Sequence, residues 1–230
     1  MTTLGELLVD VKSKLDESGV SRAWPNEDLR RWIMEGARDL ARRSEILQTT
    51  ALIPIVAGTN EYTCPDDVVR INRAIWLPTS SPTTQYPLEP EDFNDMDAAG
   101  WTWTTARGYP TIFTLWGFPP ALKLILYPTP SAAGNVKLWY YKFPTVLASN
   151  GDDDDQTVDL PLGWQDMVAA YCEMVALRKD GDQRWMEART LYEASLNELI
   201  DRTRRWTDQA GAIAHNNTWL PGWLYNPDGY

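Results

Sequence analysis

The sequence predicts an α+β fold in which helices from both ends of the chain form a bundle, with an antiparallel, sandwich-like β domain inserted between them. Two observations support this fold class. Apolar residues recur every three or four positions near both ends, which is the period of a helix that buries one face. Between these stretches, short runs of β-branched and aromatic residues alternate with turn residues, as in antiparallel sheets. The chain of 230 residues is 43% hydrophobic, which is enough to bury a core in both parts.

Residues 1–48 are expected to supply two helices of the bundle. The first spans 3–18, and the second spans 26–44 with Asn26 as its N-cap. Acidic residues in the first turn of the second helix and arginines in its last turn favour the helix dipole. The apolar stripes of the two helices are Leu4, Leu7, Leu8, Val11 and Leu15, and then Leu29, Trp32, Ile33, Gly36, Ala37 and Leu40.

Residues 49–160 are expected to form the β-rich domain as a small sandwich or a curled sheet in meander order. Alternation along the last strand places Trp139 and Tyr141 on one face and Leu138 and Tyr140 on the other, and core packing accounts for one of these faces. The six predicted strands are 51–56, 61–64, 68–77, 111–116, 121–127 and 136–143.

The stretch 79–110 is expected to be a long loop with a short helix at 91–97. Loops of this length in a compact domain are usually functional or covered by a partner. Trp101 and Trp103 lie in it, and the whole chain holds 12 tryptophans, a residue type favoured at interfaces. Trp101 and Trp103 are therefore candidate exposed aromatic contacts.

Residues 161–208 are expected to supply the two C-terminal helices of the bundle, at 164–179 and 182–207. The apolar positions of the second helix have near-heptad spacing, which suits packing against other helices. Arginines in its last turns serve either the helix dipole or a contact with another subunit or partner. These candidate contact residues are Arg202, Arg204 and Arg205.

Residues 209–230 have no helical or strand period and are expected to form an extended aromatic arm. Left free, such a segment would expose apolar surface that soluble proteins avoid. It either packs on its own bundle or orders on a partner, and the second interpretation is preferred here. The aromatic residues of the expected docking arm are Trp219, Trp223, Tyr225 and Tyr230.

The net charge of −11 argues against a sequence-specific reader of duplex DNA, because such a protein presents a basic face to phosphates. The acid is concentrated in the β segment, where residues 51–160 hold 6 basic and 13 acidic side chains. No apolar run reaches the roughly 20 residues needed to span a bilayer. With two cysteines and no signal-peptide pattern, the chain is expected to be soluble and to be made in a reducing cytoplasm.

Residues typical of catalysis or metal binding are scarce. The lone histidine, His215, has no partner at triad or ligand spacing. The acidic run 152–155 is the best cation candidate, but adjacent aspartates cannot all face one ion, so a solvated turn is the preferred interpretation. Cys64 and Cys172 are interpreted as small buried hydrophobes. The sequence therefore predicts no enzyme, no cofactor and no metal site.

Several short motifs follow one another in an order that resembles a known family. Residues 50–71 contain I-P-I, G-x-x-E-Y and P-D-D-V-x-R-I, and G-Y-P-T-I-F begins at Gly108. L-I-L-Y-P-T-P begins at Leu124, and W-Y-Y begins at Trp139. With two helices before and two after, this order resembles the head-to-tail adaptor proteins of tailed bacteriophages, including the tail tubular protein A of podoviruses.

The resemblance implies a structural virion protein at the head–tail junction. Such adaptors form a ring, twelve subunits in the family, beneath the portal protein, and they extend the DNA ejection channel and provide the attachment platform for the tail or nozzle. DNA would pass through without sequence-specific binding, which suits an acidic chain. The aromatic arm matches, by position, the segment that reaches the portal ring in such adaptors.

Two other functions stay open on the residues alone. A tail-associated carbohydrate-binding module would use Trp101, Trp103 and Trp139 as sugar platforms. Four flanking helices count against it, because lectin modules rarely need them. A hydrolase that uses carboxylates of the β segment is the weaker rival, since no pair of acids stands out at glycosidase distance.

Overall fold

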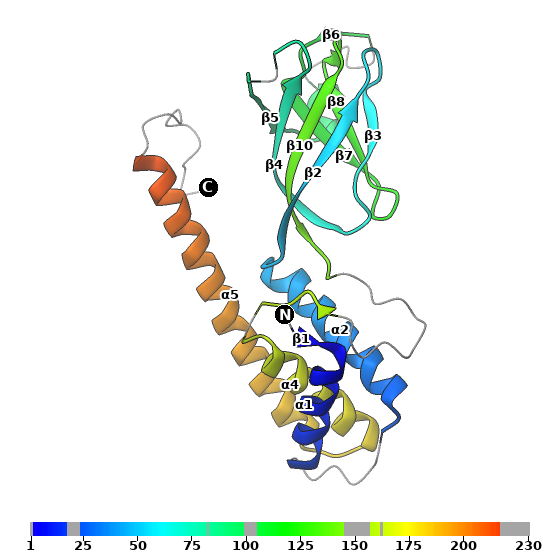
Figure 1. Cartoon of the computed structure of the whole chain (residues 1–230), viewed down its shortest axis with the longest axis vertical. Coiled ribbons are helices and arrows are strands. Elements are labelled where there is room, and N and C mark those ends of the chain that lie inside the picture. The colour runs from blue at the N-terminus through cyan, green and yellow to red at the C-terminus, as the bar shows by residue number, and fades with distance from the viewer. Residues whose placement is uncertain are drawn as a thin grey trace.

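The computed structural model describes residues 2–17, 24–81, 83–98, 105–144, 157–161 and 163–216. It shows an elongated molecule with a helical region at one end and a β region at the other (Figure 1). The final helix extends well beyond the other helices (Figure 1). The mixed α+β composition predicted from the sequence is confirmed.

Four long helices pack around one hydrophobic core in the helical region. Their bounds are α1 (Leu4–Glu17), α2 (Asn26–Ser44), α4 (Gln165–Asp180) and α5 (Trp185–Asn216). The core combines apolar residues from the stripes of α1, α2 and α4 with Tyr192 and Leu196 of α5 and with Val158, Leu160 and Trp164 before α4. A short antiparallel pair, β1 (Thr2–Thr3) with β11 (Thr157–Val158), joins the start of the chain to the segment that precedes α4.

Helix α4 lies against α1, α2 and α5, so it is the central element of this core. Gly36 of α2 permits one of these contacts, because a Cβ there would lie 3.0 Å from the ring of Tyr171. Tyr171 in turn packs edge-on against Tyr192 of α5, with ring centroids 5.6 Å apart. The missing side chain at Gly36 therefore sets how closely α2 approaches α4.

Two helix ends differ from the sequence predictions. Asn26 is the first helical residue and not the N-cap, because Pro25 occupies that position and its carbonyl accepts a hydrogen bond from the Leu29 amide at 3.2 Å. Helix α5 continues to Asn216, beyond the predicted end at 207. Alanines at 210, 212 and 214 favour helix strongly, which explains the extension despite the intervening glycine.

Seven strands form the main sheet of the β region. All six predicted strands are confirmed, and β5 is an additional one within the expected long loop. The strands are β2 (Gln48–Ile55), β3 (Glu61–Thr63), β4 (Val68–Pro78), β5 (Tyr86–Pro90), β7 (Ile112–Trp116), β8 (Lys123–Tyr127) and β10 (Gly134–Lys142). The expected short helix is α3 (Phe93–Ala98), and β6 (Arg107–Gly108) pairs with β9 (Thr129–Pro130).

The prediction of a purely antiparallel meander is wrong. The strand order is β2-β10-β4-β5-β7-β8-β3, and β5 pairs with β7 in parallel, with α3 between them in the sequence. The seven strands form one curved, nearly closed sheet in which β2, β10 and β4 face the viewer of Figure 1 and β7 and β8 lie behind. A sandwich of two separate sheets does not describe this order.

The inside of the curved sheet holds a second hydrophobic core. It shares no residue with the core of the helical region. Val136, Leu138 and Tyr140 of β10 point into it, while Trp139 lies on the outer face, as alternation predicted. Trp76 is fully buried beside Gly134, where a Cβ would lie 2.6 Å from the indole ring.

Candidate interaction surfaces

The residues proposed as contacts from the sequence fall into two groups. Trp101, Trp103 and the aromatic residues of the arm, Trp219, Trp223, Tyr225 and Tyr230, lie outside the described residues, as does the acidic run 152–155. The three arginines lie on α5. Arg202 is exposed and donates to Glu198 one turn earlier at 3.1 Å, and the exposed Arg205 donates to the Asp201 carbonyl at 3.3 Å. Both therefore have partners on their own helix.

A charged cluster fixes α5 against α2. The Arg43 guanidinium donates to both carboxylate oxygens of Glu193, at 3.1 Å for the Nη1–Oε1 pair. The Tyr192 hydroxyl donates to Asp39 at 2.9 Å. The hydrogen bond from Arg43 lowers the pKa of Glu193, and burial raises the pKa of Tyr192. Glu193 is thus ionised and Tyr192 neutral at neutral pH, so both bonds are intact there.

Two large grooves flank this part of the molecule. One, of about 610 Å³, lies among α2, α4 and α5 and is lined by both acidic and basic side chains. The other, of about 480 Å³, lies between Arg38 of α2 and loops of the β region that include Asp66, Pro119 and Phe143. Neither lining has one dominant charge or a group poised for chemistry.

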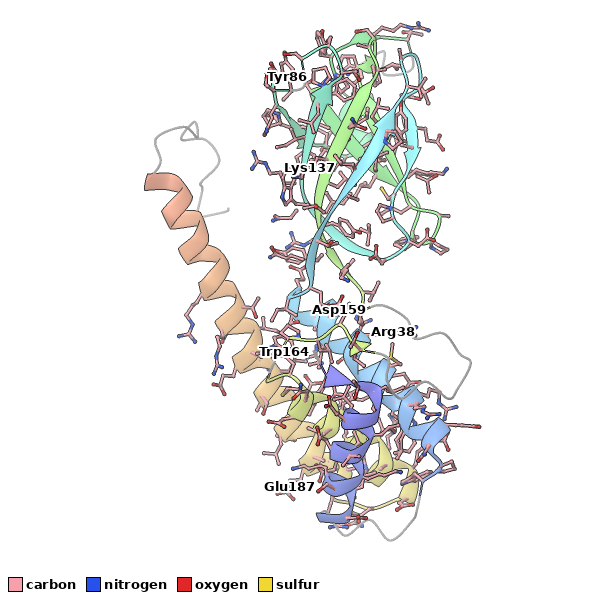
Figure 2. All side chains as sticks on the ribbon, viewed as in Figure 1. Arg38, Tyr86, Lys137, Asp159, Trp164 and Glu187 are labelled. Atoms are coloured by element: carbon pink, nitrogen blue, oxygen red, sulfur yellow. The ribbon has the colours of Figure 1, made fainter. Side chains whose placement is uncertain are left out.

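The connection between the helical and β regions is short and reinforced by charge. Glu45, which ends α2 in a left-handed conformation with φ of 51°, accepts two hydrogen bonds from Arg70 of β4. Lys142 at the end of β10 forms an ion pair with Asp159. Figure 2 shows Asp159 at the junction of the two regions. Strands β2 and β10 are paired where the chain enters and leaves the β region. The two regions are therefore joined by two chain segments that pair with each other as strands. An ion pair lies beside each of the two segments.

The outer face of β2, β10 and β4 combines cations with aromatic rings. Trp139 has the Lys137 ammonium 4.6 Å from its ring centroid and the Arg73 guanidinium 5.5 Å away. Arg70 lies 5.0 Å from the ring of Tyr141. Figure 2 shows Lys137 on the front of the β region. Trp139 and Tyr141 were singled out in the sequence, but the cations around them were missed. Arg70 and Arg73 come from β4 and meet these rings only through strand pairing, whereas Lys137 shares β10 with Trp139 and alternation could have found it.

The back of the same sheet carries acidic and apolar residues. Helix α3 packs there, since its Phe93 contacts Trp116 edge-on at 5.6 Å and its Met96 is buried. Glu91 precedes this helix and Asp95 lies in its first turn. The β7–β8 hairpin beside it leaves Trp116 65% exposed and Phe118 86% exposed. Exposed aromatic residues at a hairpin tip are typical of contact surfaces in assemblies.

The residues described offer little for catalysis. Burial raises the pKa of Cys64 to about 11 and raises that of Cys172 further, so both thiols stay protonated at neutral pH and are poor nucleophiles. Among the described residues, no three histidine, cysteine or acidic side chains gather as a metal site would require. Within the same part of the chain, none of the helices is apolar over a length that would cross a membrane.

Comparison with known protein families favours one of the remaining interpretations. The model of the SU10 adaptor protein family matches residues 2–215, which is nearly the whole chain. The chain belongs to the SU10 adaptor protein family. A search of curated proteins found no match.

As a member of the SU10 adaptor family, the chain is a structural adaptor of a bacteriophage virion that acts with portal and tail components. The resemblance to phage adaptors is confirmed at this level, and the closer likeness to tail tubular protein A stays a prediction. A structural adaptor family agrees with a non-enzymatic role. The carbohydrate-binding alternative is not favoured.

Proposed function

We propose that this SU10 adaptor assembles as a twelve-subunit ring beneath the portal, extends the DNA channel and provides the platform on which the tail or nozzle attaches. The family match over residues 2–215 is the observation that carries the proposal. A ring of identical subunits needs two different contact faces on each copy, and this elongated molecule offers ample surface for them (Figure 1). The net charge of −11 suits a conduit that repels phosphate and lets DNA slide through.

The aromatic arm after α5 is the proposed contact with the portal. Helix α5 extends past the rest of the helical region, so its last residue, Asn216, lies away from the helical core (Figure 1). Its aromatic residues, Trp219, Trp223, Tyr225 and Tyr230, are of the kind that dominate binding energy at protein interfaces. Arg202, Arg204 and Arg205 lie upstream on α5 and are proposed as further contacts with the portal or a neighbouring subunit.

The ring is tested by the mass of the assembly. Mass photometry of the purified 26.2 kDa chain, alone and mixed with portal rings, is expected to show a portal-bound species heavier by twelve copies. A chain that stays monomeric in the presence of portal would contradict the proposal. A different integral number of copies would correct the subunit count and keep the ring.

The arm is tested by deleting residues 217–230, which leaves α5 whole. We expect the shortened protein to keep the circular dichroism spectrum and melting temperature of the full chain but to lose co-sedimentation with portal rings. A matched control exchanges Trp219 and Trp223 for Phe, which keeps the apolar surface and should retain most binding. Unchanged co-sedimentation of the shortened protein would remove the arm from the portal contact.

A further inference from the structure

The structure points to a specific contact between neighbouring copies of this chain: the cationic–aromatic outer face of β2, β10 and β4 in one copy packs on the acidic α3 side of the next. We name these the front face (Leu52, Arg70, Arg73, Lys137, Trp139 and Tyr141) and the back face (Glu89, Glu91, Asp95, Trp116 and Phe118). The inference rests on the proposed ring and identifies the surfaces that would build it. It places ring contacts in the β region.

The front face departs in charge from the rest of the molecule. The chain is acidic, and its β segment is the most acidic part. The outer face of β4 and β10 nevertheless presents three cations, Arg70, Arg73 and Lys137. Within the described part of the chain, Arg73 and Lys137 have no carboxylate at ion-pair distance, and only Arg70 is paired, with Glu45. Both unpaired cations lie over Trp139, which orders them on the surface. Such a face is complementary to an acidic one.

The front face also has the composition of a protein interface. Leu52 sits opposite Lys137 in the strand register and is 62% exposed. Trp139 is half-buried, and Arg73 is exposed. Aromatic residues and arginine are the types enriched where proteins contact one another, and a strand face held by a sheet loses little entropy on binding.

The back face supplies the matching charge. The segment from Glu89 to Asp95 contains Glu91, Asp92 and Asp95 and no basic residue. Among the described residues, none of these acids has an ion-pair partner. The neighbouring cation, Lys123 of β8, is already 3.7 Å from Glu61.

Helix α3 presents this acidic segment on the outside of the sheet. Thr114 and Ile125 point outward by alternation yet are buried, and Phe93 of α3 lies against Trp116. These contacts place α3 over the outer side of β7 and β8. The exposed rings of Trp116 and Phe118 then add apolar surface next to the acids.

The two faces lie on opposite sides of one curved sheet. In the strand order β2-β10-β4-β5-β7-β8-β3, β10 is separated from β7 and β8 by about half of the turn. Figure 1 shows β10 in front and β7 and β8 behind. Complementary patches on opposite sides of one subunit make a head-to-tail contact, which closes into a ring when each copy is rotated relative to the last.

DNA phosphates are the other anions that could meet the front face. Three cations, one of them already paired, are few for duplex binding, which draws on many phosphate contacts. The exposed Leu52 and the half-buried Trp139 indicate a protein partner. The test below separates the two.

Charge exchange tests the contact. The front variant carries Arg73→Glu and Lys137→Glu, and the back variant carries Glu91→Lys and Asp95→Lys. Each alone should lower the apparent affinity between copies about tenfold or more, measured by mass photometry under the conditions in which the wild type assembles, free or on portal rings. An equimolar mixture of the two variants should assemble again, and so should one chain that carries all four exchanges, because opposite charges then meet.

A matched control reverses two exposed cations of the helical region, Lys12→Glu and Arg31→Glu, and should assemble as the wild type does. Circular dichroism melts verify that every variant is folded. The assigned contact is wrong if both variants assemble as well as the wild type does, or if their equimolar mixture fails to assemble. Either result would leave the proposed ring itself unaffected, provided that the wild type assembles. A front variant that assembles normally but loses retention on duplex DNA would assign the face to DNA instead. A wild type that never assembles would remove the ring itself.

Discussion

At the scale of single residues, close packing depends on positions where a side chain is absent. Gly134 begins β10 between the backbone of β4 and the buried Trp76. A Cβ there would lie 2.4 Å from the Leu77 carbonyl oxygen, closer than any real contact. The sequence shows a glycine in a turn-like stretch, but the contact that requires it comes from β4, more than fifty residues earlier.

Gly134→Ala is therefore expected to destabilise the protein by roughly 3 kcal/mol, because backbone cannot move aside as a flexible side chain can. Gly108→Ala is the matched control, since its nearest neighbour would be a Pro128 ring atom at 3.6 Å. Urea unfolding followed by tryptophan fluorescence measures both. Equal urea midpoints for the two variants would show that β10 can shift to accommodate the alanine without loss of stability.

At the scale of elements, helices and strands form largely where local pattern predicts them. The helical period of α1, α2 and α4 and the alternation in β2, β4 and β10 are carried by neighbouring residues, so they are visible in one sequence. Strand β5 was missed because prolines disfavour strands. The strand forms despite Pro87 and Pro90, because the Glu89 amide donates to the Thr111 carbonyl just before β7 at 2.9 Å and the Glu91 amide donates to the Phe113 carbonyl of β7 at 3.0 Å.

The end of α2 offers a prediction at this scale. Glu45→Ala and Glu45→Gly both remove the ion pair with Arg70, but only glycine adopts φ of 51° without strain. The glycine variant should be the more stable of the two by about 1 kcal/mol. At the exposed helical position Glu35 the same two substitutions should rank in the opposite order. Thermal melts of the four variants check the reversal, and the same order at both sites would contradict the role of the left-handed cap.

At the scale of the whole molecule, two hydrophobic cores are joined by a short double connection. The cores share no residue, and β2 and β10 are paired where the chain crosses between them. Because the chain enters and leaves the β region at adjacent points, this region can be excised with its two ends close together. The two regions and their charged junction would let a ring subunit use each end for a different contact.

We expect residues 46–144 to fold when expressed alone, because the chain ends meet at the Gln48–Tyr141 pair. The fragment should give a dispersed NMR spectrum and one cooperative melt. Introducing Gly134→Ala into the fragment should lower its melting temperature as in the full chain. A fragment without a cooperative transition would show that the β region needs the helical region to fold.

The sequence by itself determined the helices, most strands, the acidic balance and the order of motifs that resembles phage adaptors. Helices, strands and motifs depend on neighbouring residues, and the net charge is a sum over residues. They can therefore be predicted without knowing which distant residues are in contact. The tertiary structure decided the parallel β5–β7 pair, the nearly closed sheet and the separation of cation and acid on its opposite sides. Arg73 and Trp139 meet only because β4 and β10 pair in one register, and Glu91 lies behind them because the sheet curls. Register and curvature arise from packing across the whole β region, which no single segment encodes.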